Sequence, residues 1–199
     1  MINTLNEFIG DMILKTFIIT LLVTVFCAAP VFAARYDRYT RDIEIKEALT
    51  ALQNAEAGEV FDNLNEKSVH IAFYDLAMLS PDYQNHFAIN TVDSFGNRYI
   101  LINSRFKYTS PEELACLIAH ESFHKSDTAT LDEETLATKK EAEYWNKLRN
   151  PAKNYGNSKL FERLNTLAEL NEKSNQNKDF IKEEICNNSF YKQQLAIVR

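Results

Sequence analysis

The residues in this sequence best suited to chemistry are two histidines and a glutamate in the segment His120-Glu121-Ser122-Phe123-His124. The histidines are four positions apart, so a helix places both imidazoles on one face, one turn apart. At that separation both rings can bind one Zn²⁺ ion. Glu121 follows the first histidine and can take a proton from a water molecule that the metal polarises. The spacing predicts a zinc site with His120 and His124 as ligands and Glu121 as general base.

The residues before the motif predict that it lies on a buried helix. Ser110 is a favourable N-cap, Pro111 suits the first helical position, and Glu113 has capping-box spacing from Ser110. The segment from Leu114 to His124 is apolar on nearly every side, which is typical of a buried helix. An ionised glutamate between two histidines is unfavourable there unless a cation compensates its charge. The setting therefore favours a bound metal over a hydrogen-bonded cluster without one.

A site with two histidines needs a third protein ligand, and acidic residues downstream supply candidates. Thr130 and Glu133 have capping-box spacing, so Glu134 is left free if Glu133 folds back to the helix N-terminus. We expect Glu134 to be the third ligand, with Glu133 and Glu141 as alternatives. Ala137 would allow this second helix to pack closely against the first. The alternative for each acid is a solvated helix N-terminus, which the helix dipole favours.

Residues 99 to 145 resemble the active-site region of small gluzincin-type zinc metallopeptidases. The similarity rests on HESFH at 120–124, a short polar link, DEETLA at 132–137, and Glu141 followed by Trp145. This pattern is most similar to exported or toxin-associated bacterial HExxH proteins. The resemblance implies a minimal gluzincin-like fold, Zn²⁺ as cofactor and a peptide or protein as substrate.

Carried over position by position, the resemblance implies that His120 and His124 bind Zn²⁺ and that Glu121 is the general base. Glu134 matches the third ligand, which thermolysin-like enzymes take from a glutamate on a later helix. Asp127 resembles an outer acid that accepts the second ring N–H of a ligand histidine. The link from His124 to Glu134 is shorter than in thermolysin. No third histidine follows at HExxHxxGxxH spacing, which disfavours a metzincin.

The N-terminal residues predict export. Thr16 to Ala33 form an apolar run preceded by Lys15, the pattern of a signal peptide cleaved after Ala33. A start at Met12 gives a more ordinary signal-peptide opening than the first eleven residues do. We therefore expect residues 1–33 to be removed and 34–199 to form a single metallopeptidase-like domain, secreted or otherwise outside the cytoplasm. The alternative is an uncleaved segment that anchors the protein in the membrane.

Composition narrows the classes of partner. The chain has 199 residues, 45% hydrophobic and 25% charged, which suits one globular domain. Its formal net charge of −6 argues against nucleic acid or an anionic membrane as the main partner. Cys116 and Cys186 remain after cleavage at Ala33. In an exported protein two cysteines could form a disulfide, although Cys116 would also suit a position in the core.

Hydrophobic periodicity predicts an α+β fold, with a small antiparallel sheet before the HExxH helix and a helical C-terminal half. Helical spacing is present at 41–56, 60–64, 130–149, 158–172 and 177–191. Strand patterns are present at 68–76, 87–89 and 98–105, with a turn at 93–97. If the strand at 98–105 lies at the sheet edge, it could hold an extended peptide by backbone pairing.

Of the other histidines and tyrosines, three could contribute to a hydrolytic site. His70 alternates with apolar neighbours and is expected to face solvent, whereas His86, in a polar loop, could bind substrate. Tyr144 and Tyr155 are candidate oxyanion donors, and the sequence does not choose between them. The function predicted is that of an exported zinc metallopeptidase. The alternatives are a zinc-binding, non-proteolytic surface or interaction protein and a metal amidohydrolase acting on a non-peptide, cell-wall substrate.

Overall fold

The computed structural model describes residues 35–125, 129–174 and 178–188. The chain divides into two compact units, Met1–Arg38 and Tyr39–Arg199. The predicted signal peptide at 1–33 and the alternative start at Met12 lie outside the described residues. Within the described ranges, no helix has the length and apolar character needed to cross a membrane.

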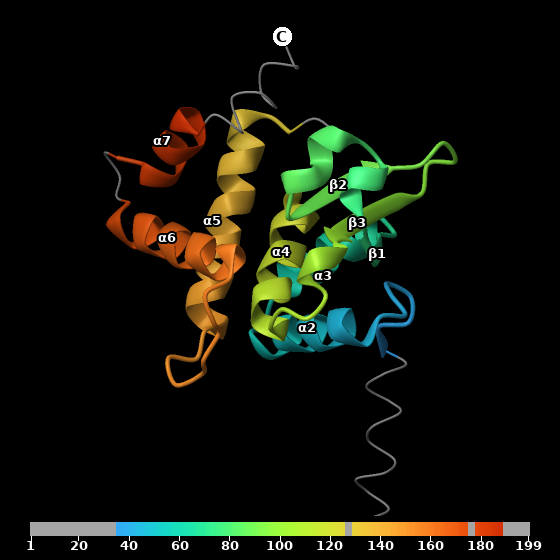
Figure 1. The fold of residues 1–199 in the computed structure, drawn as a ribbon, viewed down its shortest axis with the longest axis horizontal. Helices are drawn as coiled ribbons and strands as arrows, with labels where there is room; N and C mark the ends of the chain where they lie inside the picture. Colours follow the sequence, from blue (N-terminus) through green and yellow to red (C-terminus); the bar gives the residue numbers. More distant parts are fainter. Residues whose placement is uncertain (1–34, 126–128, 175–177, 189–199) are drawn as a thin grey trace, which may run out of the picture. The chain divides into compact units, whose positions relative to one another are not determined.

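The second unit is a mixed α and β structure (Figure 1), which confirms the predicted α+β class. Its helices before and after the sheet are α2 (Ile43–Asn54), α3 (Gly58–Glu66), α4 (Pro111–Phe123), α5 (Leu131–Leu148), α6 (Lys159–Lys173) and α7 (Phe180–Asn187). The strands are β1 (His70–Tyr74), β2 (Ala88–Val92) and β3 (Arg98–Asn103). Short 3₁₀ helices are η1 (Leu76–Met78), η2 (Pro81–Asn85) and η3 (Ser104–Phe106).

The sheet is mixed, so the prediction of an antiparallel sheet is wrong for one of its pairs. The strand order is β1-β3-β2, with β3 parallel to β1 and antiparallel to β2. A tight turn joins β2 to β3, with Asp93 N–H donating to the Asn97 carbonyl at 2.9 Å. The longer segment 75–87, which carries η1 and η2, joins β1 to β2, and β2 then returns the chain so that β3 can pair parallel to β1.

β3 is the central strand of this sheet, so the prediction that it could bind a peptide at the edge is wrong. Ile100 pairs with Ile71 on one side and with Asn90 on the other. Ile100 and Ile102 are both fully buried. The apolar run YILI in this strand is typical of a strand enclosed by neighbours.

The HExxH helix, α4, lies between α5 and the sheet. It packs against α5 on one side and against β2 and β3 on the other, and it also contacts α2 (Figure 1). Its predicted start is confirmed: Ser110 Oγ accepts from Glu113 N–H, and the Glu113 carboxylate accepts from Ser110 N–H, both at 3.3 Å. Every side chain from Glu113 to Ser122 is buried, as the apolar character of the helix predicts.

Candidate metal centre

His120 and His124 face each other at the C-terminal end of α4. Their Nε2 atoms lie 3.1 Å apart, and their ring planes are inclined at 63°. The two residues are 7% and 6% exposed. Glu121 completes a buried group in which one ligand atom of each residue lies within 4.8 Å of the others. Such a group could hold a metal ion, as the HExxH spacing predicts.

Glu134, on the first turn of α5, directs its carboxylate at both imidazoles. Its Oε2 lies 3.7 Å from His120 Nε2, and its Oε1 lies 3.6 Å from His124 Nε2. Burial raises the pKa of Glu134. Among the described residues, Oε2 has no hydrogen-bond partner. A buried carboxylate oxygen in that position is unfavourable by itself, and a cation beside it would compensate the charge.

The other two acids, Glu133 and Glu141, lie near the opposite nitrogens of the same rings. Glu141 Oε2 lies 3.0 Å from His120 Nδ1, and Glu133 Oε1 lies 3.7 Å from His124 Nδ1. The two Nε2 atoms therefore share Glu134, whereas each Nδ1 atom has an acid of its own. Glu134 and the two Nε2 atoms thus form an inner group, and Glu133 and Glu141 lie outside it.

The capping box expected at the start of α5 is half formed. Thr130 Oγ1 accepts from Glu133 N–H at 3.2 Å, as expected. The Glu133 carboxylate does not return to the cap and instead accepts a hydrogen bond from Lys125 N–H. Glu133 therefore ties the start of α5 to the residue that follows His124.

Glu141 is fully buried and connects the histidines to α6. Its Oε1 pairs with Nη1 of Arg163, whose guanidinium also lies over the ring of Phe87, 5.4 Å from the centroid. Burial by itself would raise the pKa of Glu141, but Arg163 and His120 outweigh it, and the pKa is lowered. Arg163 was not among the predicted site residues, because a lone arginine on a helix normally indicates a solvated face.

Burial and neighbouring charges shift the pKa values of the site's titratable groups in different directions. Burial raises the pKa of Glu121 to about 7. Burial opposes protonation of His120, but the carboxylate of Glu141 outweighs it and raises the pKa to about 9. Burial and the charge of His120 lower the pKa of His124 to about 3. A metal that binds both rings needs an unprotonated Nε2 on each, so metal binding at this site depends on pH.

The two tyrosines predicted as possible oxyanion donors are engaged elsewhere. Tyr144 OH donates to Glu59 Oε1 at 3.1 Å, and this buried phenol has a raised pKa. Tyr155 OH accepts from Asn150 N–H at 2.8 Å, and its ring packs against Trp145. Neither hydroxyl forms a hydrogen bond with the histidine group.

The other residues considered from the sequence are His70, His86 and Asp127. His70 is exposed on β1, as expected. His86 is 8% exposed after η2, where it contacts the ring of Tyr83 edge-on at 5.1 Å. His86 is therefore a buried residue at the end of an exposed polar segment, and its predicted role in binding substrate stays a prediction. Asp127 lies outside the described residues.

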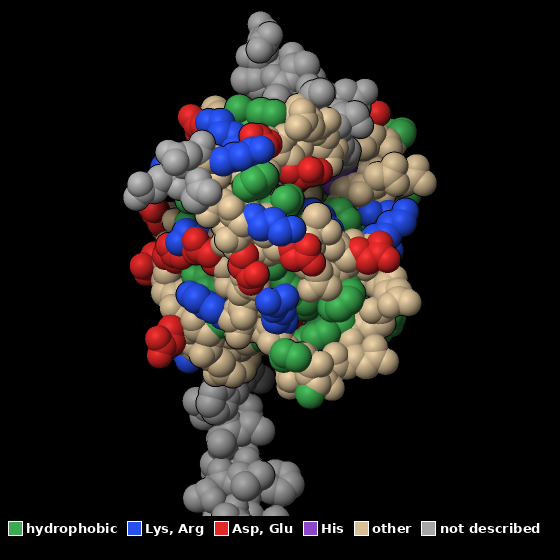
Figure 2. All heavy atoms as spheres, turned by 90° about the vertical axis from the view of Figure 1, so that its left-hand side faces the viewer, with side chains coloured by type: hydrophobic (Ala, Val, Ile, Leu, Met, Phe, Trp, Pro, Cys, Tyr) green, Lys and Arg blue, Asp and Glu red, His purple; other side chains and the backbone are tan. Residues whose placement is uncertain are grey.

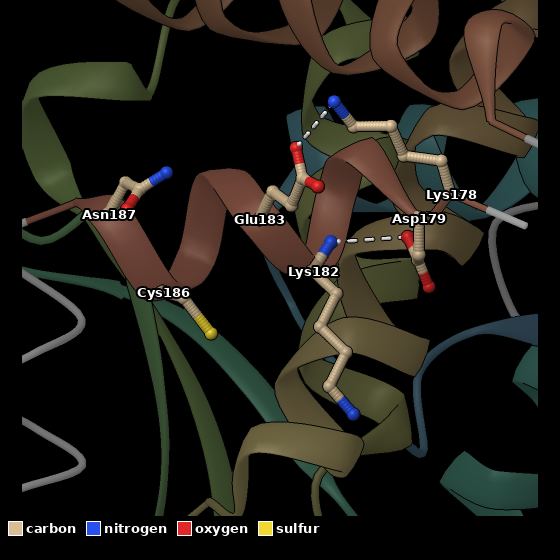
Figure 3. Close-up of a pocket in the computed structure, with 6 residues that line it drawn as sticks. All are labelled: Lys178, Asp179, Lys182, Glu183, Cys186 and Asn187. Carbon is tan, nitrogen blue, oxygen red and sulfur yellow. Dashed lines mark hydrogen bonds and ion pairs between the residues drawn. The ribbon is translucent and has the colours of Figure 1, made fainter.

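A pocket of about 330 Å³ lies on α7 (Figure 3) and contains none of the histidine-group residues. It is lined by Lys178, Asp179, Lys182, Glu183, Cys186 and Asn187. Lys178 and Glu183 pair with each other at 3.3 Å, whereas Asp179 and Lys182 pair with Lys139 and Asp132 on α5. Cys186 is an exposed free thiol and Cys116 a buried one, so the two cysteines do not form the disulfide that the sequence left open.

The face that carries α6 and α7 mixes charges of both signs (Figure 2). Several of them pair across helices: Lys139 with Asp179 at 2.6 Å, and Arg149 with Glu172 at 3.5 Å. Nucleic-acid-binding surfaces, in contrast, gather basic residues on one face.

Comparisons of the chain with protein-family models, curated proteins and solved structures found no match. A function for this protein therefore has to be argued from the chemistry of the site itself.

Proposed function

We propose that this protein is an exported zinc-dependent metallopeptidase. In this proposal His120, His124 and Glu134 bind Zn²⁺, and Glu121 is the general base. The observation that carries the proposal is the convergence of both Nε2 atoms and both Glu134 oxygens, with a base one residue from the first ligand.

The separations of these atoms fit a zinc ion. Ligands at about 2.0–2.2 Å from a tetrahedral zinc lie about 3.3–3.6 Å from one another. The two Nε2 atoms are 3.1 Å apart, and Glu134 lies 3.7 and 3.6 Å from them. Two imidazoles and one carboxylate are also a ligand set found in catalytic zinc sites, which keep one position open.

When bound, the zinc would polarise the scissile carbonyl and acidify the attacking water. Glu121 would take the proton of that water and pass it to the leaving amine. A base that must both accept and release a proton works best with a pKa near the working pH, and in the metal-free chain burial raises the pKa of Glu121 to about 7. Burial thus makes Glu121 suitable as a general base.

Two acids would hold the ligand rings in place. Glu141 lies 3.0 Å from Nδ1 of His120, where it could accept the ring N–H, and Glu133 lies 3.7 Å from Nδ1 of His124, close enough to interact with that ring by charge. Accepting that proton fixes the tautomer that presents Nε2 to the metal. The distances favour this outer role for both acids over the third-ligand role considered from the sequence.

The position of β2 supports an extended peptide as substrate. Among the described strands, β2 pairs with β3 alone, whereas Ile71 on the other outer strand donates its N–H to Tyr39 O at 2.7 Å. β2 packs on α4, and Asn90 of β2 donates to the Glu121 carbonyl at 2.8 Å. A peptide added along β2 would therefore run close to the general base.

The test is hydrolysis of a mixed peptide library by the zinc-loaded chain, with the Glu121→Gln variant as control. We expect cleavage by the wild type and none by the variant, which keeps its ligands. Cleavage of a cell-wall amide in place of peptides would favour the amidohydrolase. Zinc binding without any hydrolysis would favour the interaction protein.

A further inference from the structure

We propose that Lys67 is a positioning residue for the metal ligand His124, acting together with Asn90 and Arg98. The three side chains hold the backbone carbonyls at the C-terminal end of α4. This inference rests on the metal centre of the proposed function.

His124 needs support because it lies beyond the last helical residue. α4 ends at Phe123, and His124 has an extended backbone with φ −70° and ψ 126°. Its N–H reaches the Glu121 carbonyl at 3.3 Å, but its own carbonyl lies outside the helical hydrogen-bond pattern. The helix places the Cα and Cβ atoms of His124, whereas contacts from outside the helix have to hold its carbonyl and the chain that follows.

Lys67 makes two such contacts. Its Nζ donates to the carbonyls of Ser122 and His124, both at 2.8 Å. A cation at the C-terminal end of a helix also interacts favourably with the helix dipole. A single ammonium group thus spans the last turn of α4 and the ligand that follows it.

The sheet supports the carbonyls on either side. Asn90 donates to the Glu121 carbonyl at 2.8 Å, and Arg98 donates to the Lys125 carbonyl at 3.1 Å. Arg98 also donates to Asn90 Oδ1 at 2.8 Å, so these two residues hold each other in place. The segment from the general base to the residue after His124 is consequently held by donors from outside α4.

The turn between α3 and β1 fixes the place from which Lys67 reaches α4. Lys67 is the C-cap of α3, and Ser68 after it has a φ of 49°, in the left-handed region. Val69 N–H donates to the Leu64 carbonyl at 3.1 Å and closes the turn. Lys67 is partly buried, and the turn anchors its backbone.

The test compares variants of the full chain for metal binding. Lys67→Met removes both hydrogen bonds but keeps the aliphatic length, and Lys67→Arg restores donors. Lys153→Met is the matched control, because Lys153 pairs with Glu112 at 2.6 Å near the other end of the same helix. The readouts are zinc affinity by chelator competition and the visible absorption bands of bound Co²⁺, which report ligand geometry.

We expect Lys67→Met to bind zinc about 10–100-fold more weakly, the range for groups that support metal ligands, and to shift the Co²⁺ bands. Lys67→Arg should recover most of the affinity, and Lys153→Met should match the wild type. Unchanged affinity and bands in Lys67→Met would overturn the positioning role and leave the proposed function intact. A wild-type chain that binds no zinc would overturn both.

If Lys67→Met does not fold, Arg98→Met provides the second measurement. Arg98 contacts the Lys125 carbonyl through an exposed hydrogen bond, so its loss threatens folding less. Weaker zinc binding and shifted Co²⁺ bands in Arg98→Met would support the inference. Wild-type values for both would overturn it.

Discussion

Glu141 Oε2 lies 3.0 Å from His120 Nδ1, the ring nitrogen other than the one that faces His124. Glu134 and Glu141 lie two turns apart on one face of α5, and each addresses a different nitrogen of His120. A single helix thus presents a carboxylate to each side of the same imidazole. This relationship separates the roles of acids that look equivalent in the sequence.

Removal of Arg163 should destabilise the protein, because it leaves the buried Glu141 without its guanidinium partner. We expect Arg163→Met to lower the free energy of unfolding by about 3 kcal/mol, the lower end of the range for a broken buried ion pair. Arg163 is itself partly exposed, which favours the lower end. Urea unfolding of the metal-free chain measures this. The double variant with Glu141→Gln should lose less than the two single variants together, and strict additivity would contradict the coupling.

Zinc binding should require both His120 and His124. We expect one zinc per wild-type chain purified without chelator, and none in His120→Ala or His124→Ala. Glu121→Gln should retain the zinc and lose hydrolysis, because it removes a base and no ligand. Mass spectrometry of the metal content decides this, and a wild-type chain without zinc would contradict the assignment.

Glu134 should contribute more to zinc affinity than Glu133. Glu134→Gln replaces the one carboxylate shared by both Nε2 atoms, whereas Glu133 lies 3.7 Å from Nδ1 of His124. We expect a loss of more than about 100-fold in Glu134→Gln and of about 10-fold in Glu133→Gln, the lower figure being typical of an outer group. The reverse order in chelator competition would assign the third ligand to Glu133.

The two cysteines should react differently with a thiol reagent. Cys186 is exposed and should react at once in the native protein. Cys116 is fully buried, and burial raises the pKa of its thiol well above the usual value, so it should react only on unfolding. Kinetics with a chromogenic disulfide reagent test this on chain beginning at Ala34. Thiols that become reactive only after reduction would indicate a disulfide.

We expect the protein to be exported and the mature chain to begin near Ala34. Small residues at positions −1 and −3 from the cleavage site favour signal peptidase, and Ala33 and Val31 supply acceptable ones. N-terminal sequencing of the species recovered outside the cytoplasm tests this. Recovery of the full-length chain in the membrane would instead favour an anchor, with the proposed zinc ligands unaffected because they lie far downstream.

Local interactions made several features predictable from the sequence. The start of α4 depends on Ser110 and Glu113, three residues apart, and its capping box has the predicted form. The HExxH spacing brings His120 and His124 together because one helical turn joins them. The strand pattern at 98–105 likewise placed the end of β3 within two residues of its observed end. In each case the deciding contact spans only a few residues.

Tertiary structure alone decided which distant residues complete these elements. The pattern of β3 does not specify whether β1 and β2 flank it, because the strand order depends on where segment 75–87 places β2 relative to β1. The sequence also does not reveal that Arg163 forms an ion pair with Glu141 or that Lys67 donates to the carbonyl of His124. Such pairs join residues far apart in the chain, so they depend on how whole helices pack, and no local spacing encodes that packing.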